Sequence, residues 1–115
     1  MDRLEAEIRG KGLSIFARID HAAGAAEVGL TLRPTELLIF GNARGGTPLI
    51  QASQTAGIDL PLKVLVWQDA GDKTWLSYNE PKWIVQRHGL GVSAEVVDKL
   101  TAALIAIAKA ATNSV

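Results

Sequence analysis

Three side chains that can move protons or bind an anion fall within four residues near the start of the chain: Arg18, Asp20 and His21. A carboxylate beside an imidazole is typical of general acid–base sites, and an arginine next to them suits an anionic ligand. The same segment also fits a junction between a strand and a helix, with Asp20 as the N-cap and His21 as the first helical residue. Because adjacent residues at such a junction often point apart, the sequence favours this structural interpretation.

A second candidate site is the glycine-rich segment GNARGGT, residues 41–47. Glycine-rich turns before a helix bind phosphate through backbone N–H groups, and the spacing of the glycines here imitates a P-loop. However, Thr47 occupies the lysine position of that motif, and Pro48 removes one amide donor. We therefore expect no nucleotide hydrolysis but a turn followed by a helix capped by Thr47, with Asn42 and Arg44 available to a weakly bound anion or small ligand.

Metal and nucleic-acid chemistry have little support in the residue types. The chain has no cysteine and only two histidines, His21 and His88, without metal-ligand spacing, so we expect no metal and no cofactor. His88 is expected at a helix end, where a positive charge is favourable without any ligand role. Three tryptophans could stack on bases, but a formal net charge of zero and the lack of a basic stripe argue against nucleic acid as a partner.

Hydrophobic spacing and capping residues predict the elements that position these groups. Helices are expected over residues 1–12, 21–29, 47–57, 80–89 and 93–111, and strands over 13–20, 35–42, 63–69 and 74–79. The last helix has the clearest signals, with Ser93 as its N-cap and Lys109 near its end. The order of elements predicts an α+β fold in which a mainly antiparallel four-stranded sheet carries helices on one face.

The expected strands carry apolar residues on both faces, where a sheet covered on one side would alternate. The segment AGDK predicts a hairpin in which Trp67 faces Leu76 and Leu65 faces Tyr78. One apolar group contains Leu13, Ile15, Leu37, Ile39, Val64 and Val66. The other group contains Phe16, Leu38, Phe40, Leu65, Trp67, Leu76 and Tyr78.

The sequence leaves open which of the two groups faces the helices. Either assignment leaves more apolar surface than a monomer with a solvated sheet face normally shows. The surface would be an interface between copies or an apolar ligand cleft, unless short helices and loops wrap round it. The expected interface residues are Phe16, Leu38, Phe40, Trp67 and Leu76.

Composition indicates a globular chain of one domain, residues 1–115, with 48% hydrophobic and 21% charged residues. The charged start, the absence of cysteine and the lack of an apolar run of about 18 residues predict a cytoplasmic protein without a membrane segment. Zero net charge gives the chain little self-repulsion, which favours self-association.

Four stretches in this order carry a family resemblance: FARIDHAA, LLIFGN with GTPL close behind, DLPLKVLVW, and WLSYNEP. Together they resemble the domain of unknown function 302, in its Thermus-type fold group, over roughly residues 4–90 and more loosely over the final helix. The resemblance implies an α+β fold akin to that of TATA-binding protein and no established activity. Family members usually have a strand before the first helix, and its absence here would leave an open sheet edge.

The leading hypothesis is a non-catalytic, cytoplasmic module that self-associates, as a dimer through its sheet face or open edge, and that holds a small ligand at the strand ends. The alternative is an enzyme or small-molecule sensor. Its pocket would be formed by Arg18, Asp20, His21, Asn42 and Tyr78.

Overall fold

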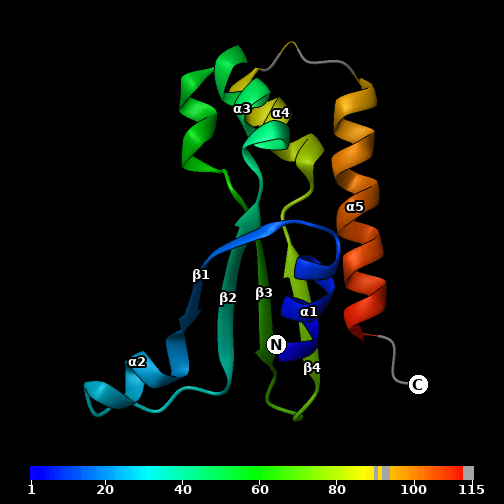
Figure 1. Ribbon diagram of the computed structural model, residues 1–115. Coiled ribbons are helices and arrows are strands. Elements are labelled where there is room, and N and C mark those ends of the chain that lie inside the picture. Colours follow the sequence, from blue (N-terminus) through cyan, green and yellow to red (C-terminus); the bar gives the residue numbers. More distant parts are fainter. Residues whose placement is uncertain (90, 92–93, 113–115) are drawn as a thin grey trace.

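The computed structural model describes residues 1–89, 91 and 94–112 and has an α+β architecture (Figure 1). Its elements in chain order are α1 (Asp2–Gly10), β1 (Ser14–Asp20), α2 (His21–Glu27), β2 (Thr35–Gly41), α3 (Ala43–Ala52), the 3-10 helix η1 (Gln54–Ile58), β3 (Leu62–Gln68), β4 (Thr74–Tyr78), α4 (Pro81–His88) and α5 (Ala94–Thr112). None of the helices in the described ranges is both long and apolar enough to cross a membrane.

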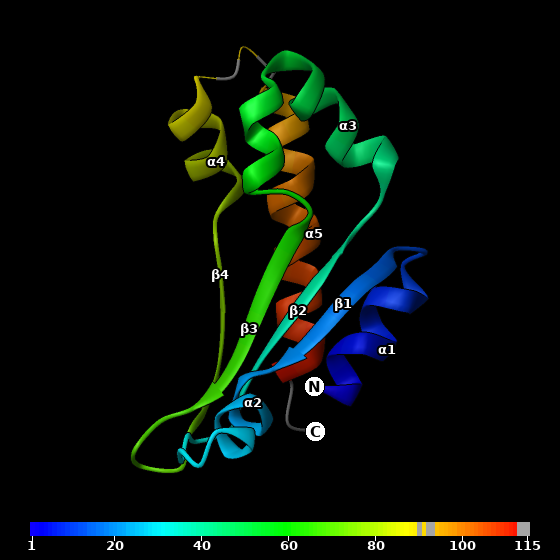
Figure 2. The same cartoon turned by 90° about the vertical axis from the view of Figure 1, so that its left-hand side faces the viewer.

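Within the described residues, four strands form one antiparallel sheet with the order β1-β2-β3-β4, so each strand pairs with its neighbours in the chain. Helices α1 and α5 pack together against one face of this sheet. Figure 2 shows the strands in front and α5 behind them. The expected antiparallel sheet with helices on one face is therefore confirmed.

The covered face and its two helices form the main core. Apolar residues at helical spacing on α1 and α5 meet the inward residues of β2 and β3, because burying both apolar surfaces removes them from water. The buried members are Leu4, Ile8, Leu38, Phe40, Val64, Leu104 and Ile107. A second, smaller core joins α3, η1 and α4 beyond one end of the sheet and consists of Leu49, Ala56, Leu60 and Ile84.

The observed strand register divides the apolar residues between the two faces of the sheet differently from the two groups expected from the sequence. Trp67 pairs with Trp75, and Val66 with Leu76, so the predicted hairpin register was wrong by one residue. Asp69 belongs to the turn, where its carboxylate accepts hydrogen bonds from the amides of Gly71 and Lys73. Since a shift of one residue moves a side chain to the opposite face, Leu76 joins the covered face.

A bulge in β1 changes the pattern of that strand. Ile15 pairs with Phe40 and Ala17 pairs with Ile39, which leaves Phe16 as an extra residue. Phe16 is 57% exposed, and beyond it Arg18 shares the covered face with its partner Leu38. The alternation read from the sequence is therefore interrupted at Phe16.

Helix α3 begins earlier than expected. Asn42 caps it by accepting a hydrogen bond from the amide of Gly45 over 2.7 Å, so the glycine-rich segment forms its first turn and not a loop. Pro48 therefore lies inside the helix, and Thr47 is not the cap. The helix ends at Ala52, before the separate η1. The predicted cap Ser93 lies outside the described residues, whereas Lys109 does lie in the last turn of α5.

The two phenylalanines of the chain give a matched test of this core. Phe40→Ala should lower the free energy of unfolding by about 3–5 kcal/mol, because Phe40 is fully buried and a cavity remains. Phe16→Ala should lower it by less than about 1 kcal/mol, because Phe16 is mostly exposed. Urea unfolding measures both, and equal losses would contradict the assignment of the core.

Candidate functional site

Arg18 is part of an ion network, not of an anion-binding site. Its guanidinium donates to Asp2 over 2.8 Å, to Glu5 over 3.5 Å and to Glu36 over 3.1 Å. The hydrogen bond with Asp2 raises the pKa of Arg18 above its ordinary value, and the same bond lowers the pKa of Asp2. Arg18 thus ties α1 to β1 and β2 with three carboxylates around it.

The other residues of the expected reactive cluster lie apart. Asp20 caps α2 by accepting from the amide of Ala23 over 2.9 Å, which confirms the capping interpretation, and His21 is exposed beside it. Asp20 pairs with Glu36, whereas Asn42 follows the opposite end of β2, about 20 Å away at the rise of a strand.

Tyr78 and Arg44 do not join the cluster either. Tyr78 lies opposite Val64 on the covered face and packs against the core. Arg44 is exposed on the first turn of α3. The expected pocket of Arg18, Asp20, His21, Asn42 and Tyr78 is therefore wrong, because strand length and the two sheet faces keep these side chains apart.

A pocket of about 200 Å³ does lie at the ends of the strands, where β2 leads into α3. Apolar side chains of several elements line it, among them Phe16, Phe40, Leu49 and Leu104. Of the predicted ligand-binding residues, Asn42 lies at this pocket. We call it the strand-end pocket.

The sheet face opposite α1 and α5 is mainly apolar, and α2 lies at one end of it, beside β2 (Figure 2). The register places on it the apolar residues Ala17, Ile19, Leu37, Ile39, Leu65, Trp67 and Trp75 together with the polar residues Thr35, Lys63 and Ser77, and we call this surface the free face. Ile19 is 39% and Trp75 42% exposed. The rings of Trp67 and Trp75 stack with centroids 6.1 Å apart.

Hydrogen bonds hold the two indoles of the free face in place. Trp67 donates to the Ser77 hydroxyl over 2.9 Å, and Trp75 donates to the Asp69 carboxylate over 2.8 Å. The bonds from Trp75 and from the amides of Lys73 and Gly71 lower the pKa of Asp69 below its ordinary value. The Lys73 ammonium lies 4.3 Å from the centroid of the Trp75 ring. The aromatic pair is thus preorganised at the surface.

The expected interface residues divide between core and surface. Leu38 and Phe40 are fully buried beneath the helices, and Leu76 packs against the same core. These three residues are corrected to core positions, because the register places them on the covered face. Trp67 lies on the free face and Phe16 is exposed at the bulge, so for these two the interface role stays a prediction.

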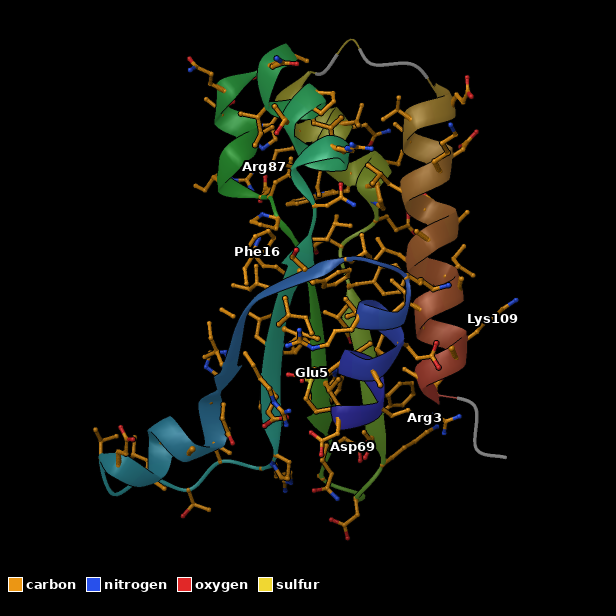
Figure 3. The ribbon with its side chains drawn as sticks, viewed as in Figure 1. Arg3, Glu5, Phe16, Asp69, Arg87 and Lys109 are labelled. Carbon is orange, nitrogen blue, oxygen red and sulfur yellow. The ribbon has the colours of Figure 1, made fainter. Side chains whose placement is uncertain are left out.

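A polar cluster joins η1 to the end of α4 and was missed in the sequence. The Nε2 atom of His88 lies 2.5 Å from an oxygen of Asp59, and its Nδ1 lies 3.1 Å from the Thr55 hydroxyl. Arg87 also donates to Asp59 over 3.0 Å, and the Ser53 and Thr55 hydroxyls lie 3.0 Å apart. This cluster lies far from the Asp69 turn between β3 and β4, since Figure 3 shows Arg87 and Asp69 at opposite ends of the sheet.

This His88 cluster has the order of groups that activates a hydroxyl nucleophile. None of its members lines the strand-end pocket, so no binding pocket accompanies it there. With His88 8% and Asp59 11% exposed, it acts as a clamp between the two helices. The partners lie 29 residues apart in the chain, and no local pattern indicated their contact.

Comparison with known families identifies the chain. The model of the family described as "Domain of unknown function DUF302" matches residues 1–107. The chain belongs to this family. A solved DUF302 structure, the crystal structure of an uncharacterized conserved protein from Bacillus stearothermophilus, has the same fold with a TM-score of 0.83. That similarity covers 96% of this chain and 86% of the other, at 21% sequence identity.

Curated relatives of this DUF302 chain carry a more specific name. Proteins of Brucella suis biovar 1 and Brucella abortus biovar 1, each named "Fluoride-specific ion channel FluC 1", are 48% identical to it over 99 residues. The match covers 86% of this chain, but only 39% and 37% of those proteins. The DUF302 chain therefore corresponds to a part of each.

Asp69→Asn tests the anchoring of Trp75. The amide nitrogen cannot accept from the indole, so we expect a lower urea midpoint at pH 7. Because the folded-state pKa of Asp69 lies below the ordinary 3.8, its stabilisation is present above that value and is lost as pH falls through the folded pKa. The variant should therefore lose less stability than the parent between about pH 5 and 2.

Asp72→Asn is the control, because it makes the same change in the same turn. It should keep the parent's dependence of unfolding free energy on pH. If Asp69→Asn also keeps that dependence, Asp69 does not anchor Trp75.

His88→Ala and His21→Ala test the clamp. Loss of His88 leaves Asp59 and Thr55 without a shared partner and should lower the free energy of unfolding by about 1–3 kcal/mol. Loss of the exposed His21 should change it by less than about 0.5 kcal/mol. Chemical unfolding at pH 7 compares the two, and an unaffected His88 variant would contradict the clamp.

Proposed function

We propose that this chain is a non-catalytic, cytoplasmic binding module that pairs with a second copy through its free face. The observation that carries the proposal is the apolar surface on the side of the sheet away from α1 and α5. Leu37 and Leu65 are paired neighbours at its centre, and the stacked Trp67 and Trp75 lie beside them. The chain has no cysteine, which is compatible with a reducing compartment.

A second copy of the chain suits this face better than a charged partner does. Two identical faces can pack about a twofold axis, with sheets about 10 Å apart and their strands within about 30° of each other. Trp75 supplies a large, held aromatic side chain of the kind that carries binding energy at interfaces. The zero net charge gives two copies little mutual repulsion.

The alternative of an enzyme or sensor required five side chains to lie around one pocket, and these side chains lie apart. Its residues Arg18, Asp20 and Tyr78 make other contacts: an ion network, a helix cap and the main core. The separate His88 cluster contains suitable groups but is not part of the strand-end pocket. A binding role therefore has more support than catalysis.

The relatives named as fluoride-specific ion channels suggest where such pairing is used. We infer that this module promotes assembly of longer proteins that contain it, because pairing of one part raises the effective concentration of the linked parts. The inference extends to those proteins because a part of each is 48% identical to this chain. Fused to a weakly dimerising reporter, the chain should strengthen the reporter's dimerisation; an unchanged reporter would contradict the inference.

Pairing through the free face is tested by two substitutions to lysine. The chain of 12.2 kDa should sediment as a dimer, and Leu37→Lys should shift it to monomer because the charge loses its water inside the interface. We expect its dissociation constant to rise by at least about 100-fold, equivalent to about 2.7 kcal/mol. Sedimentation equilibrium over a range of concentrations gives both constants.

Ile105→Lys is the matched control, since Ile105 is 42% exposed on α5, the helix on the other side of the sheet. It should leave the dimer intact. A parent chain that is monomeric at every concentration, or two variants that dissociate equally, would overturn the proposal.

A further inference from the structure

We propose that the strand-end pocket binds a small, uncharged and mainly apolar molecule that carries one hydrogen-bond acceptor. The pocket is lined from β1, β2, α3, β3 and α5 and from Leu60 and Pro61 before β3, and none of the residues named for the free face contributes to it. This site is therefore independent of the pairing proposed above.

Two glycines in the first turn of α3 contribute to the wall of the pocket. Gly45 and Gly46 both line it. A Cβ atom added to Gly46 would meet no atom within 4 Å, so a side chain at this position would enter open space. Glycine inside a helix lowers its stability by roughly 1 kcal/mol relative to alanine. A Cβ atom added to Gly45 would lie 3.9 Å from Leu100 Cδ2 and 3.4 Å from Asn42 Oδ1, two residues that also line the pocket, so glycine at position 45 leaves this part of the wall without a side chain.

The lining determines the class of ligand. None of its described residues is charged, so an ion would lose its hydration without a compensating partner. The polar side chains that line it are Asn42 and Thr47. The Oδ1 atom of Asn42 is already occupied by the amide of Gly45, which leaves its amide N–H groups to donate to a ligand acceptor.

The volume determines the size of that ligand. A space of about 200 Å³, filled to the packing density of a protein interior, holds roughly ten non-hydrogen atoms. Apolar cavities of similar size bind small aromatic rings. Phe16 and Phe40 offer ring faces or edges for contact with such a ring. The structure therefore favours a single ring with a carbonyl or ether group.

Acetophenone and benzoate are a suitable pair of probes, since they have similar size and differ in charge. In heteronuclear NMR titrations of the full chain, acetophenone should shift the amide signals of Gly45 and Gly46, and benzoate should bind at least about tenfold more weakly. Stronger binding of benzoate would indicate an anion site at the start of α3 and overturn the proposal. So would unchanged signals at saturating acetophenone.

Two neighbouring alanines of α5 give the matched variants. Ala103 lines the pocket, whereas Ala102 is exposed and does not line it. Ala103→Leu should weaken acetophenone binding at least about tenfold, and Ala102→Leu should leave it unchanged. Gly46→Leu, which adds a large side chain at another residue that lines the pocket, is a second variant expected to block binding in case the first perturbs folding. Equal binding by the blocked and control chains would contradict this location.

Failure of this proposal is distinguishable from failure of the pairing proposal. The Leu37→Lys chain should bind acetophenone like the parent, because Leu37 does not line the pocket. Loss of binding in that variant would show that the site depends on pairing and would contradict its independence.

Discussion

Burial of one face of a single β-sheet beneath α1 and α5 is the constraint on which the rest of the structure depends. Leu38, Phe40 and Val64 face these helices and are almost fully removed from water. Since side chains alternate along a strand, fixing these three residues also fixes the opposite set, which includes Leu37, Ile39 and Leu65. Most of that second set is apolar as well, although it also includes Thr35, Lys63 and Ser77, and α1 and α5 lie on the other side of the sheet. A partly exposed, mainly apolar surface is therefore a direct consequence of how the core is built.

Most of the polar side chains described above either connect neighbouring elements or cap helices. Arg18 joins α1 to the sheet through carboxylates, Asp20 and Asn42 begin helices, and His88 with Asp59 joins α4 to η1. Hydrogen-bonded side chains of this kind fix the orientation of elements that hydrophobic packing alone would leave less defined. The two surfaces proposed for binding, the free face and the strand-end pocket, are both mainly apolar.

Local signals in the sequence were sufficient for the fold class and for several element boundaries. The α+β architecture, the cap at Asp20 and the two-sided apolar strands follow from spacing and residue type. The start of α3 could not be predicted in the same way. Both Asn42 and Thr47 are suitable N-cap residues, and the structure uses Asn42, which places Pro48 inside the helix. The bulge at Phe16 and the register of the hairpin depend on how the strands pair, and the contacts of His88 depend on how α4 packs against η1. The candidate site was misplaced for the same reason: proximity along a strand or across a turn does not bring side chains to one face.

The central claim is that a second copy of the chain covers the free face. Solvent paramagnetic relaxation of isoleucine and leucine methyl groups tests it most directly, measured at low and high protein concentration. We expect the methyl groups of Leu37, Ile39 and Leu65 to become protected as concentration rises, while those of Ile105 and Ile58 stay accessible. Equal accessibility of the free-face methyl groups at both concentrations would contradict the account.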